Sequence, residues 1–342
     1  MEEVKQKTGG YESELRQDIV TGDWVVIATG RAKRPDEFAS AGKRAGDADP
    51  DDPFADPDGS GQEKDILIYR LSDGDWSVRV FPNKYPAFTR GRAVKDLSDG
   101  PYFAMSGVGY HELIVTRDPV KSLALLPQWQ VAEVFDAYQS RYLDLMNKKS
   151  VNYIQILHNH GKEAGASIAH PHSQLMAIPV VSPYIQSELT GAELYYRSHR
   201  KKVYQVMTDR EREERSRIVY ENDDFIAFCP FASRSAFEVW VTAKRDGSPY
   251  FERITDEQKF SLAEVFQKAM FALYQGLSDP AFNFYIHTAP CDGRDYPHYQ
   301  WHIEILPKTA TWAGFELSTG IEISTIEPEK AAEFLREQLS FF

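Results

Sequence analysis

The sequence predicts an α+β fold made of two tandem units, with antiparallel sheets and helices packed on one face. A strand–helix–strand–strand order occurs twice along the chain. His172 and His302 lie 130 residues apart, and Asn152 and Asn283 repeat within one residue of that offset. Such an internal repeat indicates a duplicated unit, and 342 residues suffice for two domains of roughly 100–200 residues. We expect the halves to be residues 1–195 and 196–342.

The first half begins with four short strands. Apolar runs bounded by Gly, Pro or Asp favour strands at 22–28, 65–69, 76–81 and 110–116. Pro82 and Pro86 restrict the residues before them to extended backbone, so the chain leaves the third strand extended. Between the first two strands, residues 36–64 are rich in Asp, Gly, Pro and Ala. This composition predicts a long surface loop.

The later elements follow the same order in both halves. Apolar residues at helical spacing predict a helix over 128–146, followed by strands at 152–157 and around His172. In the second half, a strand at 236–242 precedes a helix that opens with a capping-box pattern at Thr255. Strands at 283–287 and 298–307 complete the second unit.

The composition bounds the class of protein. The net charge of −12 argues against a partner that is a nucleic acid or an anionic membrane. Two cysteines exclude a disulfide framework, and no apolar run approaches the ~20 residues of a membrane span. The first residues lack the apolar region of a signal peptide, so we expect a soluble, cytoplasmic protein. The basic run 31–35 is either a local site for an anionic metabolite or a solvated loop.

The segment 164–179 carries the clearest chemical signal. Residues two apart in an extended chain face the same side, so His170, His172 and Gln174 should line one face. A polar loop with glycines at 161 and 165 precedes them, and glycines let backbone N–H groups approach an anion closely. This combination favours phosphoryl or nucleotidyl transfer, in which one imidazole attacks and amides and hydroxyls hold phosphate oxygens. A metal pair, or histidines that only satisfy the core, are the alternatives.

Several motifs resemble the histidine-triad superfamily, and more closely its two-unit branch, the galactose-1-phosphate uridylyltransferase family. The first half contributes Arg31-Ala-Lys-Arg34-Pro, Phe81-x-Asn83-x-Tyr85-Pro-Ala, Asn159-x-Gly161-x-x-x-Gly165-x-Ser167 and His170-Pro-His172-x-Gln174. The second half contributes Trp301-His302-Ile-Glu-Ile-Leu-Pro, Gly314-Phe-Glu316 and Pro328-Glu-Lys-Ala-Ala332. The resemblance covers most of the chain.

The resemblance implies a role for each matching residue. His172 would take the nucleotidyl group, and the His170 carbonyl would accept the hydrogen bond that fixes its ring. The phosphate oxygens would be held by Gln174, Ser167, Asn159 and Gly165. The nucleoside would be bordered by Phe81, Asn83 and Tyr85, and the sugar by Phe315 and Glu316. The resemblance also implies a homodimer, in which Arg31 and Arg34 meet phosphate in the neighbouring subunit.

Two metal sites of the family are altered in this chain. The family's Cys-Pro-x-Cys zinc motif reads Asp52-Pro-Phe-Ala55, and a further histidine ligand reads Pro119. Only His170 remains of that tetrad, so we expect no structural zinc there. At the second site, Gln300 stands where the family has a ligand, and His298 is a possible substitute. We expect Zn or Fe to be held by Glu188, His287, His298 and His302.

The family implies a transfer that needs no cofactor for its chemistry. We expect UDP-glucose to give UMP to His172, and galactose-1-phosphate to accept it in a second, ping-pong step. The hexose-binding Lys and Gln of better-known relatives are not evident between Ala310 and Glu322. An ADP-glucose phosphorylase-type enzyme is therefore the alternative. A rival from another class is a nucleotide-binding protein without catalysis. In each case the partners are nucleotide sugars or sugar-1-phosphates.

Overall fold

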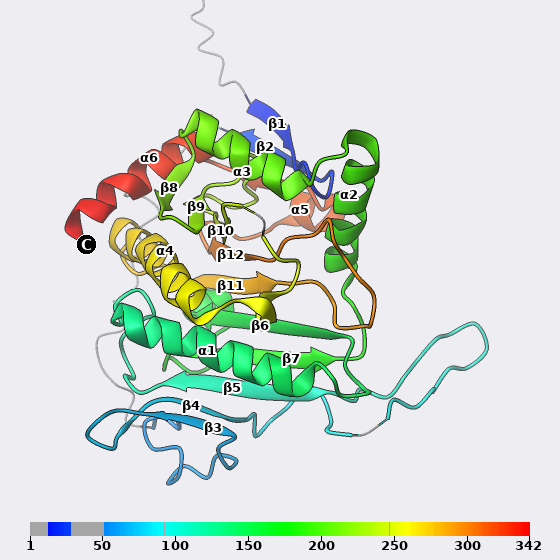
Figure 1. Cartoon of the computed structure of the whole chain (residues 1–342), viewed down its shortest axis with the longest axis vertical. Helices are drawn as coiled ribbons and strands as arrows, with labels where there is room; N and C mark the ends of the chain where they lie inside the picture. The colour runs from blue at the N-terminus through cyan, green and yellow to red at the C-terminus, as the bar shows by residue number, and fades with distance from the viewer. Residues whose placement is uncertain (1–12, 29–50, 92, 246) are drawn as a thin grey trace, which may run out of the picture.

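A ten-stranded antiparallel sheet forms the centre of the computed structural model, which describes residues 13–28, 51–91, 93–245 and 247–342. Figure 1 shows its strands stacked from one end of the molecule to the other. In spatial order they are β3 (Leu67–Arg70), β4 (Trp76–Pro82), β5 (Tyr110–Thr116), β7 (His172–Ile178), β6 (Tyr153–His160), β11 (Phe282–His287), β12 (His302–Pro307), β10 (Val239–Ala243), β9 (Phe225–Phe228) and β8 (Ile218–Glu221).

The strand order is mirrored about the centre of this sheet. Counted inward from each edge, β3, β4, β5, β7 and β6 correspond to β8, β9, β10, β12 and β11. The two halves join where β6 pairs with β11, with Asn159 opposite Asn283. The predicted α+β class and its duplicated unit are thus confirmed, and the two units share one continuous sheet.

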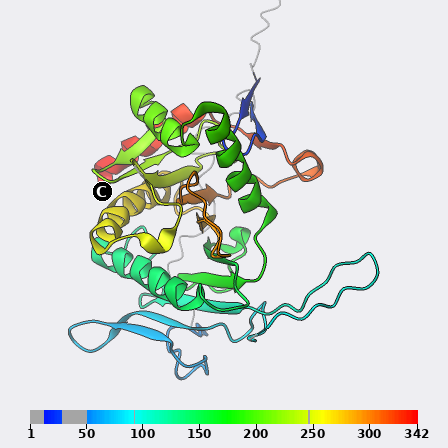
Figure 2. The same cartoon turned by 45° about the vertical axis from the view of Figure 1, so that its right-hand side comes forward.

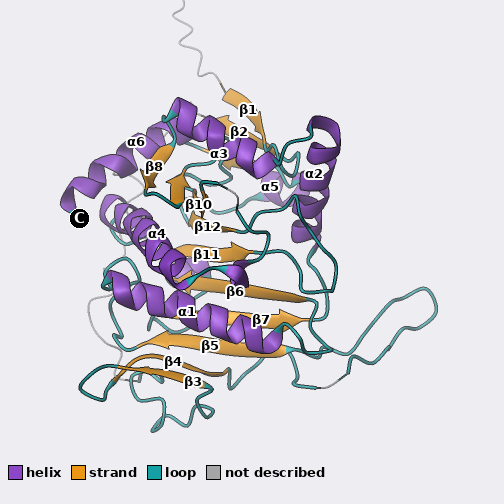
Figure 3. Cartoon of the chain, in the orientation of Figure 1, coloured by secondary structure: helices purple, strands orange, loops and turns teal. Residues whose placement is uncertain are grey.

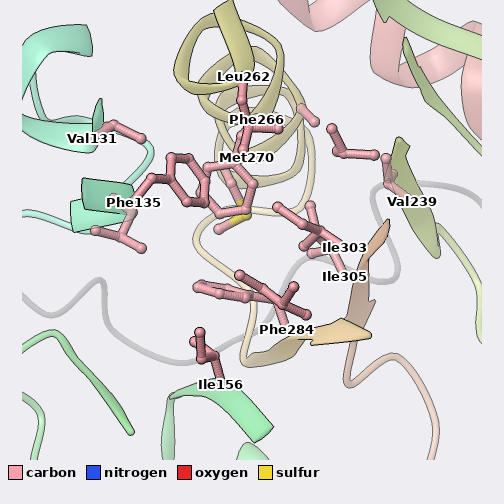
Figure 4. Packing of buried hydrophobic residues seen from close by; sticks show 14 of the residues in the cluster. Val131, Phe135, Ile156, Val239, Leu262, Phe266, Met270, Phe284, Ile303 and Ile305 are labelled. Atoms are coloured by element: carbon pink, nitrogen blue, oxygen red, sulfur yellow. The ribbon is translucent and has the colours of Figure 1, made fainter. Parts of the chain in front are cut away.

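Two long helices cover one face of the sheet. These are α1 (Gln128–Leu145) and α4 (Asp256–Gly276), which lie side by side, with α6 (Pro328–Gln338) against α4 (Figure 3). Between them and the strands lies a core to which both halves contribute (Figure 4). The ring of Phe266 packs edge-on against Phe135 of α1 at 5.3 Å and Phe284 of β11 at 5.2 Å. The capping box predicted at Thr255 is confirmed by its reciprocal hydrogen bonds with Gln258.

The opposite face is covered differently in the two halves. Over the second half lie α2 (Pro183–His199) and α3 (Val203–Glu214), whose apolar side chains pack on β9 and β10. Neither helix was predicted, although Ser182 caps α2 and Pro183 occupies its first turn. Over the first half, Phe54 from the loop before β3 packs on Phe81 and Leu113. This loop leaves room for a cavity, described below.

The remaining elements lie at the periphery. A second sheet joins β1 (Ser13–Gln17), β2 (Trp24–Ala28) and β13 (Glu322–Ser324), and β13 runs parallel to β2. Residues 93–108 extend from the body as a long arm (Figure 2). The short helices are η3 (Lys162–Ala164), η4 (Phe251–Arg253), α5 (Gly314–Thr319) and η5 (Leu339–Phe341). No described helix is both long and apolar enough to cross a membrane.

Two predicted strands of the second half begin later than the sequence indicated. The run 236–242 becomes regular only at Val239, because Phe237 adopts a left-handed backbone conformation with φ of 65°. The run 298–307 becomes a strand only at His302. The irregular segment before it places the Gln300 carbonyl 3.1 Å from Nδ1 of His302.

Candidate active site

Alternation along β7 places His172 and Gln174 on the sheet face that α1 and α4 leave free. The neighbouring side chains point the other way, toward the helices. Ser173 forms a hydrogen bond of 2.5 Å with the Tyr138 hydroxyl of α1, and Leu175 lies in the main core. Of the three residues predicted to share one face, His172 and Gln174 therefore do so, whereas His170 precedes the strand.

A hydrogen bond to the backbone orients the His172 ring. Its Nδ1 lies 2.8 Å from the carbonyl oxygen of His170. A carbonyl only accepts, so Nδ1 carries the proton and Nε2 keeps a lone pair. Burial lowers the pKa of His172 below its ordinary value, and the bond to His170 opposes this only in part. At neutral pH the ring is thus a neutral imidazole with a fixed tautomer, which is the nucleophilic form.

A cavity of about 360 Å³ opens beside His172. It brings together five residues predicted from the sequence: His172, Gln174, Ser167, Asn83 and Tyr85. The other lining residues are Pro53, Phe54, Ser60, Gln62, Lys84, Leu113 and Ile168. Hydroxyl, amide and ammonium groups around one reactive imidazole can hold an anionic phosphate in position.

The loop over this cavity is fastened at two places. Asp52 Oδ2 lies 2.6 Å from Nδ1 of His170, whose Nε2 lies 2.6 Å from the Thr116 carbonyl oxygen. Farther along the loop, Asp58 forms a 2.9 Å ion pair with Arg79 of β4. Both ring nitrogens of His170 are therefore engaged, and neither has a lone pair directed at a metal. The absence of a structural zinc stays a prediction, which this bonding supports.

The loop between β6 and β7 depends on two glycines and a contact between the halves. Gly161 has φ of 79°, and a side chain there would lie 2.7 Å from Cβ of Ala281. Gly165 has φ of 87°. The Asn283 amide donates to Oδ1 of Asn159 at 2.7 Å and to the Ala164 carbonyl at 2.8 Å. The second half thus holds the loop that leads to Ser167.

The structure does not bring every predicted residue to the cavity. Asn159 lies near the end of β6 and Gly165 in the loop that follows, and neither lines the cavity. Phe81 is fully buried behind it, with its ring against Phe54 at 5.8 Å. Phe315 and Glu316 lie on α5, where the Glu316 carboxylate accepts from the Ala313 N–H. Arg31 and Arg34 fall outside the described residues.

A second cluster of ionisable groups is buried in the other half. Ligand atoms of Glu188, His287, His302 and Glu304 all lie within 4.8 Å of one another. Glu304 takes the place that we expected His298 to fill. His298 instead stacks on Tyr196 at 3.6 Å beside a separate cavity of about 690 Å³.

The groups around this cluster orient its carboxylates. Tyr299 donates to Oε2 of Glu188 at 2.6 Å, which leaves Oε1 facing the two imidazoles. Arg234 pairs with Oε2 of Glu304, which likewise leaves Oε1 on their side. Two imidazoles and two carboxylates oriented by such partners form a donor set that suits Zn²⁺ or Fe²⁺.

His302, like His172, has Nδ1 beside the carbonyl oxygen of the residue two positions earlier, but its Nε2 does not face a cavity. Its Nε2 lies 3.4 Å from Oε1 of Glu304, and the Trp240 ring stacks on it at 4.5 Å. Gln300 is turned away, and its amide donates to Oγ1 of Thr242 at 2.8 Å. The second histidine is therefore enclosed, and only the first faces a cavity.

Sequence reasoning missed several residues at or beside the cavity, and three of them contact the reacting groups or carry charge. Phe54 lies edge-on to the His172 ring at 5.1 Å, and Lys84 lines the cavity. His111 of β5 contacts Oε1 of Gln174 through Nε2 at 2.8 Å. Alternation along 110–116 could have placed His111 on the right face. The pairing of β5 with β7, which brings it to Gln174, is not readable from the chain alone.

Comparisons with known proteins show which family the sequence resembles along its length. A family profile for the N-terminal domain of galactose-1-phosphate uridyl transferase matches residues 2–182, and one for a domain of unknown function, DUF4921, matches residues 130–341. An ADP-glucose phosphorylase from Arabidopsis thaliana is 32% identical over 333 residues, covering 95% of this chain and 92% of that protein. A galactose-1-phosphate uridylyltransferase from Thermotoga maritima is 29% identical over 336 residues, covering 95% and 98%.

Solved structures with a similar fold are found in the same family. The Arabidopsis thaliana ADP-glucose phosphorylase with bound ADP-glucose superimposes with a TM-score of 0.79 at 28% identity, covering 95% of this chain and 99% of that one. A uridylyltransferase structure with a TM-score of 0.72 at 23% identity, covering 96% and 99%, has the same fold.

Proposed function

The chain belongs to the galactose-1-phosphate uridylyltransferase family, and from that premise we propose that it transfers a nucleotidyl group from a nucleoside diphosphate hexose through His172. The observation that carries this proposal is the 2.8 Å bond from Nδ1 of His172 to the His170 carbonyl. That bond turns the unprotonated Nε2 into a nucleophile beside a cavity lined by Ser167, Lys84 and Gln174.

Two displacements at one phosphorus account for the reaction. The Nε2 lone pair attacks the α-phosphorus of the donor, and the bond to the bridging oxygen breaks, so that hexose-1-phosphate leaves with the electron pair. An oxygen of the acceptor phosphate then attacks the same phosphorus, and the phosphorus–nitrogen bond breaks. The proton stays on Nδ1, and this N–H continues to donate to the His170 carbonyl oxygen, which stabilises the positive charge on the nucleotidylated ring.

ADP-glucose is the donor that we favour, with inorganic phosphate as acceptor. The similarity to the Arabidopsis thaliana ADP-glucose phosphorylase, at 32% identity and a TM-score of 0.79, supports this choice. UDP-glucose with galactose-1-phosphate is the second candidate. The match of residues 2–182 and the 29% identity to the Thermotoga maritima uridylyltransferase support it.

We also propose a metal site and a dimer. Glu188, His287, His302 and Glu304 would hold Zn²⁺ or Fe²⁺, which when bound supplies a cross-link between α2, β11 and β12. The transfer itself needs no cofactor.

In the homodimer that the family implies, the basic run 31–35 would reach phosphate in the partner's cavity, and sedimentation of the purified protein tests that assembly.

The deciding experiment is the intact mass of the protein after brief mixing with ADP-glucose or with UDP-glucose, without acceptor. We expect the mass to increase by one AMP with ADP-glucose, and we expect no increase in His172→Ala. The control variant His199→Ala, which changes an exposed histidine of α2, should still gain the AMP. The His172→Ala variant should retain less than about one thousandth of turnover and still bind nucleotide. An added UMP would select the second candidate, and no adduct from either donor would favour a nucleotide-binding protein without catalysis.

A further inference from the structure

We propose that His111 is a positioning residue that keeps the N–H donors of the Gln174 amide directed at the phosphate. This inference rests on the proposed transfer through His172. It concerns which way round the Gln174 amide stands, because an amide turned by 180° would present an oxygen instead of donors to an anion.

The sheet brings the two side chains together from segments far apart in sequence. In the β5–β7 register, Leu113 is opposite Gln174 and His111 is opposite Met176. His111 and Gln174 are therefore diagonal neighbours on one face, within reach of each other's side chains. The His111 ring is buried, and its Nε2 lies 2.8 Å from Oε1 of Gln174.

The backbone before β5 decides which ring nitrogen carries the proton. The Ala87 N–H donates to Nδ1 of His111 at 3.2 Å, so Nδ1 must be an acceptor. A neutral imidazole then has its proton on Nε2. Burial lowers the pKa of His111, which agrees with a neutral ring. Nε2 therefore donates to Gln174, and the Gln174 atom that faces it is the oxygen.

A third side chain leaves this assignment unchanged. Nδ2 of Asn83 lies 3.2 Å from Nε2 of His111 and 3.5 Å from Nδ1. If Nδ2 of Asn83 lay in the plane of the imidazole at these two distances, it would clash with Cε1 or with the opposite edge of the ring. The Asn83 amide therefore lies over the face of the ring and does not compete for the proton on Nε2. Oδ1 of Asn83 accepts from the Tyr85 N–H at 2.9 Å. His111 is thus packed between Asn83, which we expect to border the nucleoside, and Gln174, which we expect to contact the phosphate.

With its oxygen engaged, the Gln174 amide has one orientation. Its NH₂ group makes no hydrogen bond to another described residue, and Gln174 lines the cavity of His172. Both N–H donors are therefore free for phosphate oxygens. A donor held in place before the reaction stabilises developing charge more than one that must first reorient.

A double-mutant cycle tests the proposal through the single-turnover rate of nucleotide transfer to His172. Gln174→Ala should lower this rate about 100-fold and His111→Phe about tenfold. In the Gln174→Ala background, His111→Phe should change it less than about twofold, because no amide remains to be positioned. His111→Gln, which keeps an N–H donor, should restore most of the rate.

A binding measurement separates this role from a loss of folding. Gln174 is assigned to the phosphate alone, so His111→Phe should weaken AMP about tenfold and leave adenosine unchanged, with UMP and uridine used if UMP is the adduct. Equal losses of rate in both backgrounds, or equal weakening of nucleotide and nucleoside, would overturn the positioning role. A wild-type protein that forms no adduct would instead overturn the proposed transfer, and this inference with it.

Discussion

The burial of His172 sets the pH range in which this residue can react. Desolvation lowers the pKa of its imidazole below 6.5, and the bond to the His170 carbonyl only partly opposes this. Only the neutral ring has a lone pair for phosphorus. Because the pKa in the folded state is lowered, the reactive neutral form still predominates at pH 6.5, and protonation removes it at lower pH.

We therefore predict a single-turnover transfer rate that falls at acid pH with a midpoint below pH 6.5. Rapid quenching followed by intact-mass measurement gives the rate at each pH. The exposed-histidine variant His199→Ala should give the same profile. A midpoint at or above pH 6.5 would contradict the buried, neutral imidazole.

At the residue scale, period-two alternation predicted the reacting face but not its supports. The spacing of His172 and Gln174 required only that the segment be a strand. The contact of His111 with Gln174 joins residues 63 positions apart and depends on strand register. Glu304 could not be predicted for the same reason. Its carboxylate meets Glu188 and His287 only when α2 and β11 pack against β12.

At the element scale, α2 meets the β1–β2 turn at a helical glycine. A Cβ on Gly191 would lie 1.7 Å from the carbonyl oxygen of Val20. In an unobstructed helix, replacing glycine by alanine stabilises by about 1 kcal/mol. Here the contact is with backbone, which cannot rotate away as a side chain does, so overpacking at a cost of about 1–3 kcal/mol outweighs that gain.

We predict that Gly191→Ala lowers the free energy of unfolding, measured by urea denaturation, whereas Thr190→Ala beside it raises this free energy slightly or leaves it unchanged. Thr190 is exposed on the same helix, so it reports helix propensity without the contact. Stabilisation by both substitutions would show that the turn does not pack on α2 in solution.

The helices differ in how far their sequences reveal them. The helix predicted over 128–146 was found as α1, because one face carries a continuous apolar stripe that the core buries. In contrast, α3 buries few residues and is rich in charged ones, so its sequence lacks a strong stripe. The late start of the strand predicted at 236–242 reflects the left-handed backbone at Phe237, which a bulky residue rarely adopts.

At the scale of the molecule, the two halves share their core. Phe135 of the first half packs on Phe266 of the second, and the joined strands β6 and β11 lie beneath both helices. Neither half can lose its structure without exposing the apolar surface of the other. Unfolding should therefore be a single event.

We predict that urea unfolding gives coincident transitions by far-ultraviolet circular dichroism and by tryptophan fluorescence. Phe266→Ala should lower the free energy of unfolding by about 3–5 kcal/mol and shift both signals together. Leu317→Ala on the exposed surface of α5 is the matched control, with a change near zero. Two resolved transitions would indicate independent halves.

The duplication was predictable, but its junction and its asymmetry were not. The 130-residue offset between His172 and His302 indicated two copies, whereas their union in one sheet depends on pairing between β6 and β11. Only one copy keeps an open histidine. In the other copy, α2 and α3 cover the same face of the sheet, and Trp240 stacks on His302. Glu304 occupies the position that corresponds to Gln174, but it is buried, whereas Gln174 lines a cavity.

The small sheet has a consequence for synthesis on the ribosome. β2 pairs in parallel with β13, yet translation separates Trp24–Ala28 from Glu322–Ser324 by roughly 300 residues. At about 5–20 residues per second, the nascent β2 would spend roughly 15–60 s without that neighbour. During this time, the edge of β2 that later pairs with β13 is open to other chains. A chaperone would therefore be of most use until β13 has been synthesised and has paired with β2.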